Sequence, residues 1–132
     1  LEHIHDLDTT LHELKKKLTA SGTIFIAVPN YKSADAIHYQ KFWAAYDVPR
    51  HLWHFNQQTM TQLLNNIGFR VEKILPMKLD AFYVALLSEK YKSPKSNTLI
   101  RYINALTHAL KSNWAARKTE QYSSLIYVAK HK

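Results

Sequence analysis

Two short segments of this 132-residue sequence concentrate side chains that can do chemistry. The first, LEHIHDLD at residues 1–8, places two histidines among carboxylates. The second, PRHLWHF at residues 49–55, combines an arginine, two histidines and two aromatic residues. Histidine is suited to proton transfer near neutral pH, and a positioned imidazole can serve as a general base. The candidate bases are therefore His3, His51 and His54.

A zinc site is the alternative chemistry for the same histidines. HIHDLD is similar to the H-x-H-x-D-H signature of the metallo-β-lactamase superfamily, but this chain has Leu7 and Asp8 where the signature needs Asp and His. His51 and His54 could add two ligands, although zinc ligands also need oriented outer partners. The sequence has no cysteine, which excludes thiolate sites and cysteine nucleophiles. We expect no metal here.

The second segment has a substrate-binding and a structural interpretation, and the residues alone leave both open. In the first, Arg50 holds a substrate carboxylate or phosphate through two hydrogen bonds, and Trp53 and Asn30 also contact substrate. In the second, Arg50 pairs with Asp47 while the aromatic residues only pack the loop. His51 or His54 would be the base in the first interpretation.

Composition predicts one globular domain spanning residues 1–132, because 46% of the chain is apolar. With two glycines, the chain cannot build a glycine-rich phosphate loop.

The net charge is unevenly distributed along the chain. Residues 1–68 hold six basic and six acidic side chains, whereas residues 69–132 hold twelve basic and four acidic ones. A basic half suggests an anionic partner such as nucleic acid, a phosphorylated substrate or a lipid surface. The simpler interpretation is that these lysines are solvated side chains on exposed helix faces. No apolar run reaches the length of a membrane span, so we expect a cytoplasmic protein.

The elements that must position these residues can be read from periodicity. Leu7, Leu11, Leu14 and Leu18 predict a helix that Asp6 or Asp8 caps and Gly22 stops, and the apolar run 23–28 predicts a strand buried on both faces. A loop rich in aromatic residues spans 30–55, with at most a short helix near 37–46.

The second half of the chain continues the alternation of helices and strands. Asn56 caps a helix with Met60, Leu63, Leu64 and Ile67 inward and Gly68 as its stop, and a strand follows at 69–75. Helices are expected at 80–91 and 98–117 and a buried strand at 123–129. The core stripe of the last helix is expected to be Leu99, Ile103, Leu106, Leu110 and Trp114. This alternation predicts an α/β fold with a largely parallel sheet. Three strands make a thin sheet with apolar edges, so we expect further strands to pair beside them.

Two stretches together resemble the C-terminal half of a class I S-adenosylmethionine (SAM)-dependent methyltransferase. They are LEHIHDLDTTLHELKKKLTASGTIFIAVPN and DVPRHLWHFNQQTMTQLLNNIGFRVEKI. The first is similar to the family's vLEHv.d, L.pgG and vPN segments, and the second to D.PrHl.hf....l..ll...GF.v. The second segment is typical of a bacterial subgroup similar to ubiquinone-type methyltransferases. Its matching residues here are Asp47, Pro49, Arg50, His51, Leu52, His54, Phe55, Leu63, Leu64, Gly68, Phe69 and Val71.

The resemblance implies the C-terminal part of a Rossmann-like methyltransferase sheet, whose final strand pairs antiparallel with 69–75. Leu1, Glu2 and His3 would lie beside the cofactor, and residues 78–118 would be a helical insertion capping the substrate. The glycine-rich cofactor loop would lie upstream, so the chain would be a fragment that is inactive and binds SAM weakly or not at all. Its missing N-terminal half or a second chain would complete the sheet. The implied substrate is a small or anionic molecule.

The alternative function is non-enzymatic. Basic residues gather among aromatic ones in the second half, as a nucleic-acid-binding module would have them, although no recognition motif accompanies them. The residues are Lys90, Lys92, Lys95, Arg101, Lys111, Arg117 and Lys118, with Tyr91, Tyr102 and Trp114.

Overall fold

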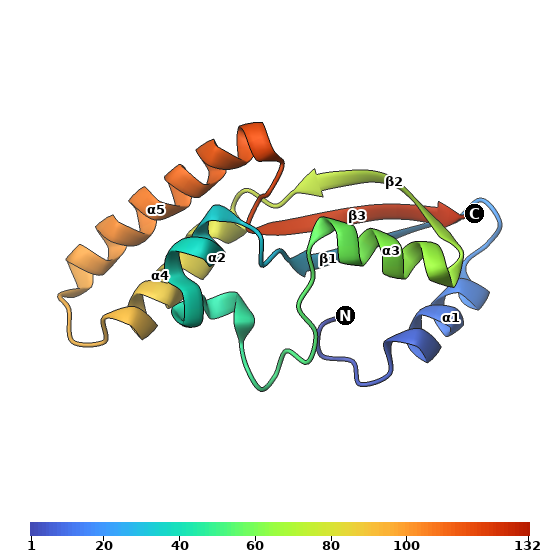
Figure 1. The fold of residues 1–132 in the computed structure, drawn as a ribbon, viewed down its shortest axis with the longest axis horizontal. Coiled ribbons are helices and arrows are strands. Elements are labelled where there is room, and N and C mark those ends of the chain that lie inside the picture. The colour runs from blue at the N-terminus through green and yellow to red at the C-terminus, as the bar shows by residue number, and fades with distance from the viewer.

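A three-stranded sheet lies at the centre of the chain, with helices beside it and a helical hairpin at one end (Figure 1). The computed structural model describes residues 1–132. The strands are β1 (Thr23–Pro29), β2 (Phe69–Pro76) and β3 (Ser124–His131). The helices are α1 (Leu7–Lys17), α2 (Ala34–Tyr39), α3 (Gln57–Ile67), α4 (Asp80–Lys92) and α5 (Thr98–Thr119), with 3-10 turns at Gln40–Phe42 and Ala44–Tyr46.

The strand order is β1-β3-β2, and both outer strands pair antiparallel with β3. The register places Ile26 of β1 and Ile74 of β2 opposite Tyr127 of β3. The predicted antiparallel pairing of the last strand with 69–75 is confirmed. The expectation of a largely parallel sheet is wrong: β1 and β2 run parallel to each other, but β3 separates them.

One face of the sheet carries the main core. Leu7 and Leu11 of α1 and Met60 and Leu64 of α3 pack there in a single cluster with Tyr127 and its neighbours on the strands. The opposite face lacks this cover, and Phe25 in β1 is 66% exposed. The expectation that β1 is buried on both faces is therefore wrong.

Local signals set the ends of α1 and α3. Asp6 caps α1 by accepting a 3.0 Å hydrogen bond from the Thr9 backbone. Asn56 caps α3, and Gly68 ends it with a φ of +89°, as predicted. Gly22 does not stop α1, because the helix already ends at Leu18 in an extended conformation.

The hairpin of α4 and α5 forms a second core with α2 and the loop that follows it. The side chains of α5 that are buried are small: Ala105, Ala109, Ser112 and Ala116. The predicted core stripe from Leu99 to Trp114 is instead exposed, so that expectation is wrong. Small residues let α5 lie close to α4, which leaves the large side chains outside. None of the helices has the length and apolar character needed to cross a membrane.

Candidate functional site

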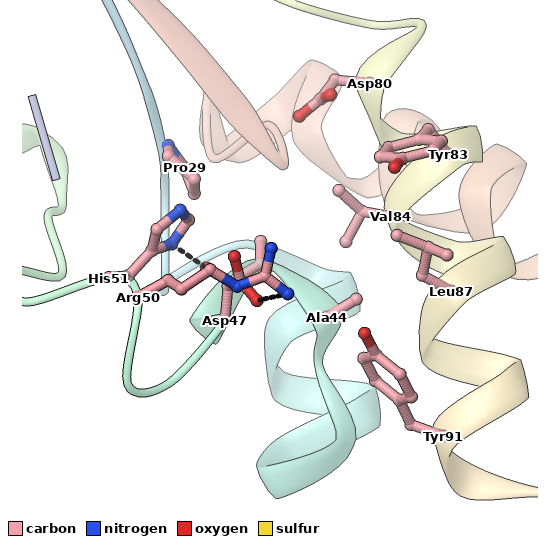
Figure 2. Close-up of a pocket in the computed structure, with 11 residues that line it drawn as sticks. Pro29, Ala44, Asp47, Arg50, His51, Asp80, Tyr83, Val84, Leu87 and Tyr91 are labelled. Atoms are coloured by element: carbon pink, nitrogen blue, oxygen red, sulfur yellow. Dashed lines mark hydrogen bonds and ion pairs between the residues drawn. The ribbon is translucent and has the colours of Figure 1, made fainter. Parts of the chain in front are cut away.

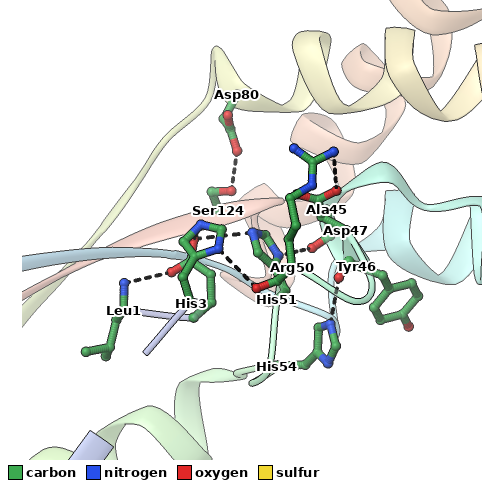
Figure 3. Close-up of polar contacts among 11 residues, drawn as sticks. Leu1, His3, Ala45, Tyr46, Asp47, Arg50, His51, His54, Asp80 and Ser124 are labelled. Carbon is green, nitrogen blue, oxygen red and sulfur yellow. Dashed lines mark hydrogen bonds and ion pairs between the residues drawn. The ribbon is translucent and has the colours of Figure 1, made fainter. Parts of the chain in front are cut away.

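The two chemistry-bearing segments lie side by side (Figure 3). The Leu52 backbone N–H donates to the Glu2 carbonyl at 2.8 Å, and the Trp53 indole donates to the Ile4 carbonyl at 2.7 Å. These two hydrogen bonds join positions at least 49 residues apart in the sequence. The structure thus brings Glu2, His3 and the PRHLWHF loop together.

His51 is held in one orientation by the backbone. Its Nδ1 lies 2.9 Å from the Ala45 carbonyl, which can only accept, so Nδ1 carries the proton of the neutral ring. Nε2 is then left with a free lone pair, 3.7 Å from Oε1 of Glu2. The side chain is only 10% exposed. An oriented imidazole with an open nitrogen beside a carboxylate can take up a proton and be stabilised as imidazolium.

His3 lies against His51, with ring centroids 4.6 Å apart in an edge arrangement. Its Nδ1 donates to the Arg50 carbonyl at 3.2 Å, and its Nε2 is 4.0 Å from Oε1 of Glu2. Both rings therefore turn Nε2 toward the same carboxylate oxygen.

Glu2 carries the negative charge of this group. Its burial raises its pKa, but a hydrogen bond from its own backbone, the Leu1 amino group at 3.0 Å and nearby His51 together lower that pKa below the ordinary value. The carboxylate is therefore ionised at neutral pH.

A cavity of about 390 Å³ opens between this loop and α4 (Figure 2). His51, Arg50 and Asp47 lie on one side, and Val84 and Leu87 of α4 form an apolar wall on the other. A concave site with an apolar wall and a few converging polar groups is the usual form of a small-molecule pocket.

Arg50 lies at the rim of this cavity. Its Nη2 is 3.4 Å from Oδ1 of Asp47, which is the pairing of the structural interpretation, and its side chain is 76% exposed. An exposed ion pair of this kind is weak, so the guanidinium can exchange Asp47 for a ligand anion at little cost.

The remaining predicted site residues lie outside the cavity lining. His54 donates from Nε2 to the Tyr46 carbonyl at 3.0 Å, and the Trp53 indole is held by its hydrogen bond to the Ile4 carbonyl. Asn30 is 1% exposed, and its amide donates to Gln121 Oε1 and the Tyr122 carbonyl. Asn30 thus ties the end of β1 to the segment before β3, and its side chain offers no free group to a substrate.

No local sequence signal indicates the polar groups that α4 contributes. Asp80, Tyr83 and Tyr91 line the cavity from that helix. Asp80 also accepts a hydrogen bond from the Ser124 hydroxyl at the start of β3. Finding these residues requires knowing that α4 folds back over the loop, which no local pattern reveals.

Two groups of donor atoms lie close enough to hold a metal ion. Glu2, His3 and His51 form one, and His38, Glu89 and His108 form the other, with ligand atoms within 4.8 Å of one another in each. Imidazole and carboxylate donors suit borderline divalent cations. His5 belongs to neither group, which contradicts the H-x-H interpretation of residues 3–5.

The sheet and the helices that cover it define a mixed α/β fold. A family model described as a methyltransferase domain matches residues 1–74. The chain belongs to this family of methyltransferase domains, which confirms the predicted membership of a methyltransferase family.

A solved structure has a similar fold. The chain resembles the mycolic acid cyclopropane synthase CmaA1, solved in complex with SAH and CTAB, with a TM-score of 0.52 and 13% identity over 99% of this chain. It spans about half of that structure, 52%. The Haemonchus contortus phosphoethanolamine N-methyltransferase 2, solved with S-adenosyl-L-methionine, is also 13% identical, with a TM-score of 0.48 over 99% of this chain and 31% of that one. Comparison with curated proteins found no match. The predicted α/β fold class is confirmed.

Proposed function

We propose that this chain is the C-terminal part of a SAM-dependent methyltransferase of the ubiquinone-type bacterial subgroup. The family match and the convergence of Glu2, His3 and His51 beside a pocket carry the proposal. In the strand order, β1 is an edge strand with one unpaired side. An apolar edge strand of this kind is a pairing surface, and the N-terminal half of the domain or a second chain would supply the next strand.

The cofactor would lie beside Leu1, Glu2 and His3. When bound, SAM supplies a methyl group from a positively charged sulfur. The Glu2 carboxylate, which lies 3.7 Å from Nε2 of His51, would match that charge. His3 would fix the local backbone through its hydrogen bond to Arg50.

The methyl acceptor would occupy the cavity of about 390 Å³. Arg50 would bind an anionic group of the substrate, and Nε2 of His51 would take the proton from the attacking oxygen or nitrogen. Glu2 would stabilise the imidazolium that forms. His54 and Trp53 each donate a hydrogen bond to a backbone carbonyl, and these bonds would hold the PRHLWHF loop in place. Residues 78–118 would cap the substrate, since α4 already forms one wall.

Calorimetry with SAM tests the cofactor assignment. We expect no detectable binding to the 132-residue chain and micromolar binding to the longest polypeptide that the gene encodes. Micromolar affinity of the short chain would show that the partial-domain proposal is wrong. Absence of SAM binding by the longer polypeptide would overturn the methyltransferase proposal itself.

His51→Asn tests the base in the longer polypeptide. SAM binding should stay unchanged, while methyl transfer to an acceptor identified by screening hydroxy and amino acids should fall by roughly 10²–10⁴. His5→Asn is the matched control, because His5 is exposed and lies outside the site. Equal rates for the two variants would remove His51 from the mechanism.

A further inference from the structure

The helix α5 carries its large apolar residues on the outside. Leu99, Ile103, Leu106, Leu110 and Trp114 are each between 52% and 67% exposed. Their spacings of four, three, four and four place them on one stripe, about 22 Å long at the rise of an α-helix. We call this set the α5 stripe. A helix in a soluble domain normally turns such a stripe toward the core, so its exposure indicates an interaction surface.

An apolar groove continues the α5 stripe toward α4. It has a volume of about 410 Å³, and all six residues that line it are hydrophobic. They are Phe82, Leu86, Tyr102, Ile103, Ala105 and Leu106. The opposite side of α4 faces the cavity with His51, so one helix separates the two hollows. A groove lined by hydrophobic side chains suits a flexible hydrocarbon segment such as an acyl chain.

The accessible charge around the α5 stripe is positive. Residues 78–120 contain eight lysines and arginines and three acids, and α5 itself contains no acid. Glu120, which follows α5 directly, is exposed. The other two acids are engaged internally: Glu89 is 3% exposed and accepts from Tyr39, and Asp80 accepts from Ser124. Lys111, Arg117 and Lys118 are exposed on α5 itself. Lys118 also lies over the Trp114 ring, 5.9 Å from its centroid.

We propose that the α5 stripe docks this protein onto an anionic lipid bilayer, with the apolar side chains at the acyl boundary and the flanking cations on the headgroups. Amphipathic helices that lie in the interface combine an apolar face holding Trp and Leu with a polar face rich in Lys and Arg. Trp114 and Tyr102 suit the headgroup level, because each joins an apolar ring to a polar tip.

Other occupants fit these observations less well. A second copy would bring an equally cationic hairpin against the first, and like charges oppose that pairing. A nucleic acid would satisfy the cations, but four of the five residues of the α5 stripe are aliphatic and offer no ring for base stacking. A bilayer with anionic headgroups satisfies both the charge and the apolar surface. This surface does not require catalytic activity, so its test is independent of the methyltransferase proposal.

Vesicle co-sedimentation of the 132-residue chain tests the proposal. We expect binding to vesicles of phosphatidylcholine and phosphatidylglycerol, and weak binding to phosphatidylcholine alone. Leu106→Ser with Leu110→Ser should weaken binding roughly ten-fold or more, because both side chains would leave the acyl boundary. Phe25→Ser is the matched control, since it removes a similarly exposed apolar side chain from β1.

Two further measurements separate the contribution of the cationic side chains from that of the apolar ones. Lys111→Ser and Lys118→Ser should each lower binding roughly five-fold, and added salt should act in the same direction. In a Trp53→Phe background, the emission of Trp114 should shift to the blue with anionic vesicles, since Trp43 is already buried. Circular dichroism of each variant checks that the fold is kept.

The proposal is overturned if anionic vesicles do not bind at low salt, or if the leucine variant binds as well as Phe25→Ser. Self-association in the absence of lipid that the leucine variant abolishes, with vesicle binding unchanged, would assign the α5 stripe to a second copy. Retention on nucleic acid that depends on the lysines, without vesicle binding, would favour the nucleic-acid module.

Discussion

Replacing Asp35 with alanine should destabilise the fold strongly. The Asp35 carboxylate is 1% exposed and accepts three hydrogen bonds. The donors are the Trp43 indole at 2.8 Å, the Ser112 hydroxyl at 2.8 Å and the Ser123 hydroxyl at 2.7 Å. Each donor belongs to a different segment, so this one side chain joins α2, the turn at Trp43, α5 and the residue before β3.

The magnitude follows from these contacts. Three hydrogen bonds to a charged group, at about 1.5–3 kcal/mol each, amount to roughly 4.5–9 kcal/mol of gross stabilisation that Asp35→Ala removes. Removing the buried carboxylate also removes its desolvation cost, so we expect a net loss of about 3 kcal/mol in the free energy of unfolding. Asp35→Asn keeps the volume and one acceptor oxygen, and should lose about half as much.

Urea denaturation followed by tryptophan fluorescence measures this loss. For a small domain, about 3 kcal/mol corresponds to a midpoint about 2 M lower. The near-UV circular dichroism of Trp43 should also weaken, because its indole loses its partner. Glu13→Ala is the control: Glu13 pairs with Lys16 at 2.7 Å on the exposed face of α1, and its loss should cost less than about 0.5 kcal/mol. If Asp35→Ala unfolds at the midpoint of Glu13→Ala, the reasoning from the buried network is refuted.

Three further predictions concern packing, backbone and pH. Gly68→Ala should cost about 1–2 kcal/mol in thermal or urea unfolding, because its φ is +89° and a methyl group there would lie 2.2 Å from a lysine amine. Ala109→Leu should cost about 1–3 kcal/mol by overfilling the contact of α5 with α4, while exposed Leu110→Ala should change stability by less than about 0.5 kcal/mol. Burial is the main cause that lowers the pKa of His38 and His108 below 6.5, so the fold favours their neutral forms. The stability they contribute is complete above the unfolded pKa and is lost as the pH falls through the folded pKa. The urea midpoint of unfolding should therefore fall as the pH is lowered from about 7 to 5. Replacing both histidines by Asn should reduce that fall. If the double variant loses as much stability over this pH range as the unchanged protein does, His38 and His108 are not its cause.

The local elements could be predicted from the sequence because their signals are local. Asn56 and Gly68 mark both ends of α3, and the apolar runs mark β1 and β3. The pairing of Arg50 with Asp47 was one of two interpretations, because two charges three residues apart in a tight turn can meet. Such features depend on neighbours in the chain and need no knowledge of the tertiary fold.

The burial of α5 could not be predicted because periodicity shows which residues share a face, and not which face is covered. Leu106 and Leu110 share a stripe with core spacing, but Ala105 and Ala109 are the residues that contact the second core. A stripe of small residues carries almost no hydrophobic signal. The same limit hid Asp80 and Tyr83, which reach the cavity only through the placement of α4.

The helical hairpin leaves the sheet and returns to it at almost the same point. Pro76 at the end of β2 pairs with Leu125 in β3, and the Met77 backbone N–H donates to the Ser124 carbonyl at 3.0 Å. The residues between these positions therefore form an insertion between β2 and β3, whose ends already lie side by side. Evolution can lengthen, shorten or exchange such an insertion without changing the strand register. A chimaera that carries a different hairpin between Met77 and Ser124 would keep the strand register, but the new hairpin would have to supply the contacts that Ser112 makes with Asp35 and Ala116 makes with the main core.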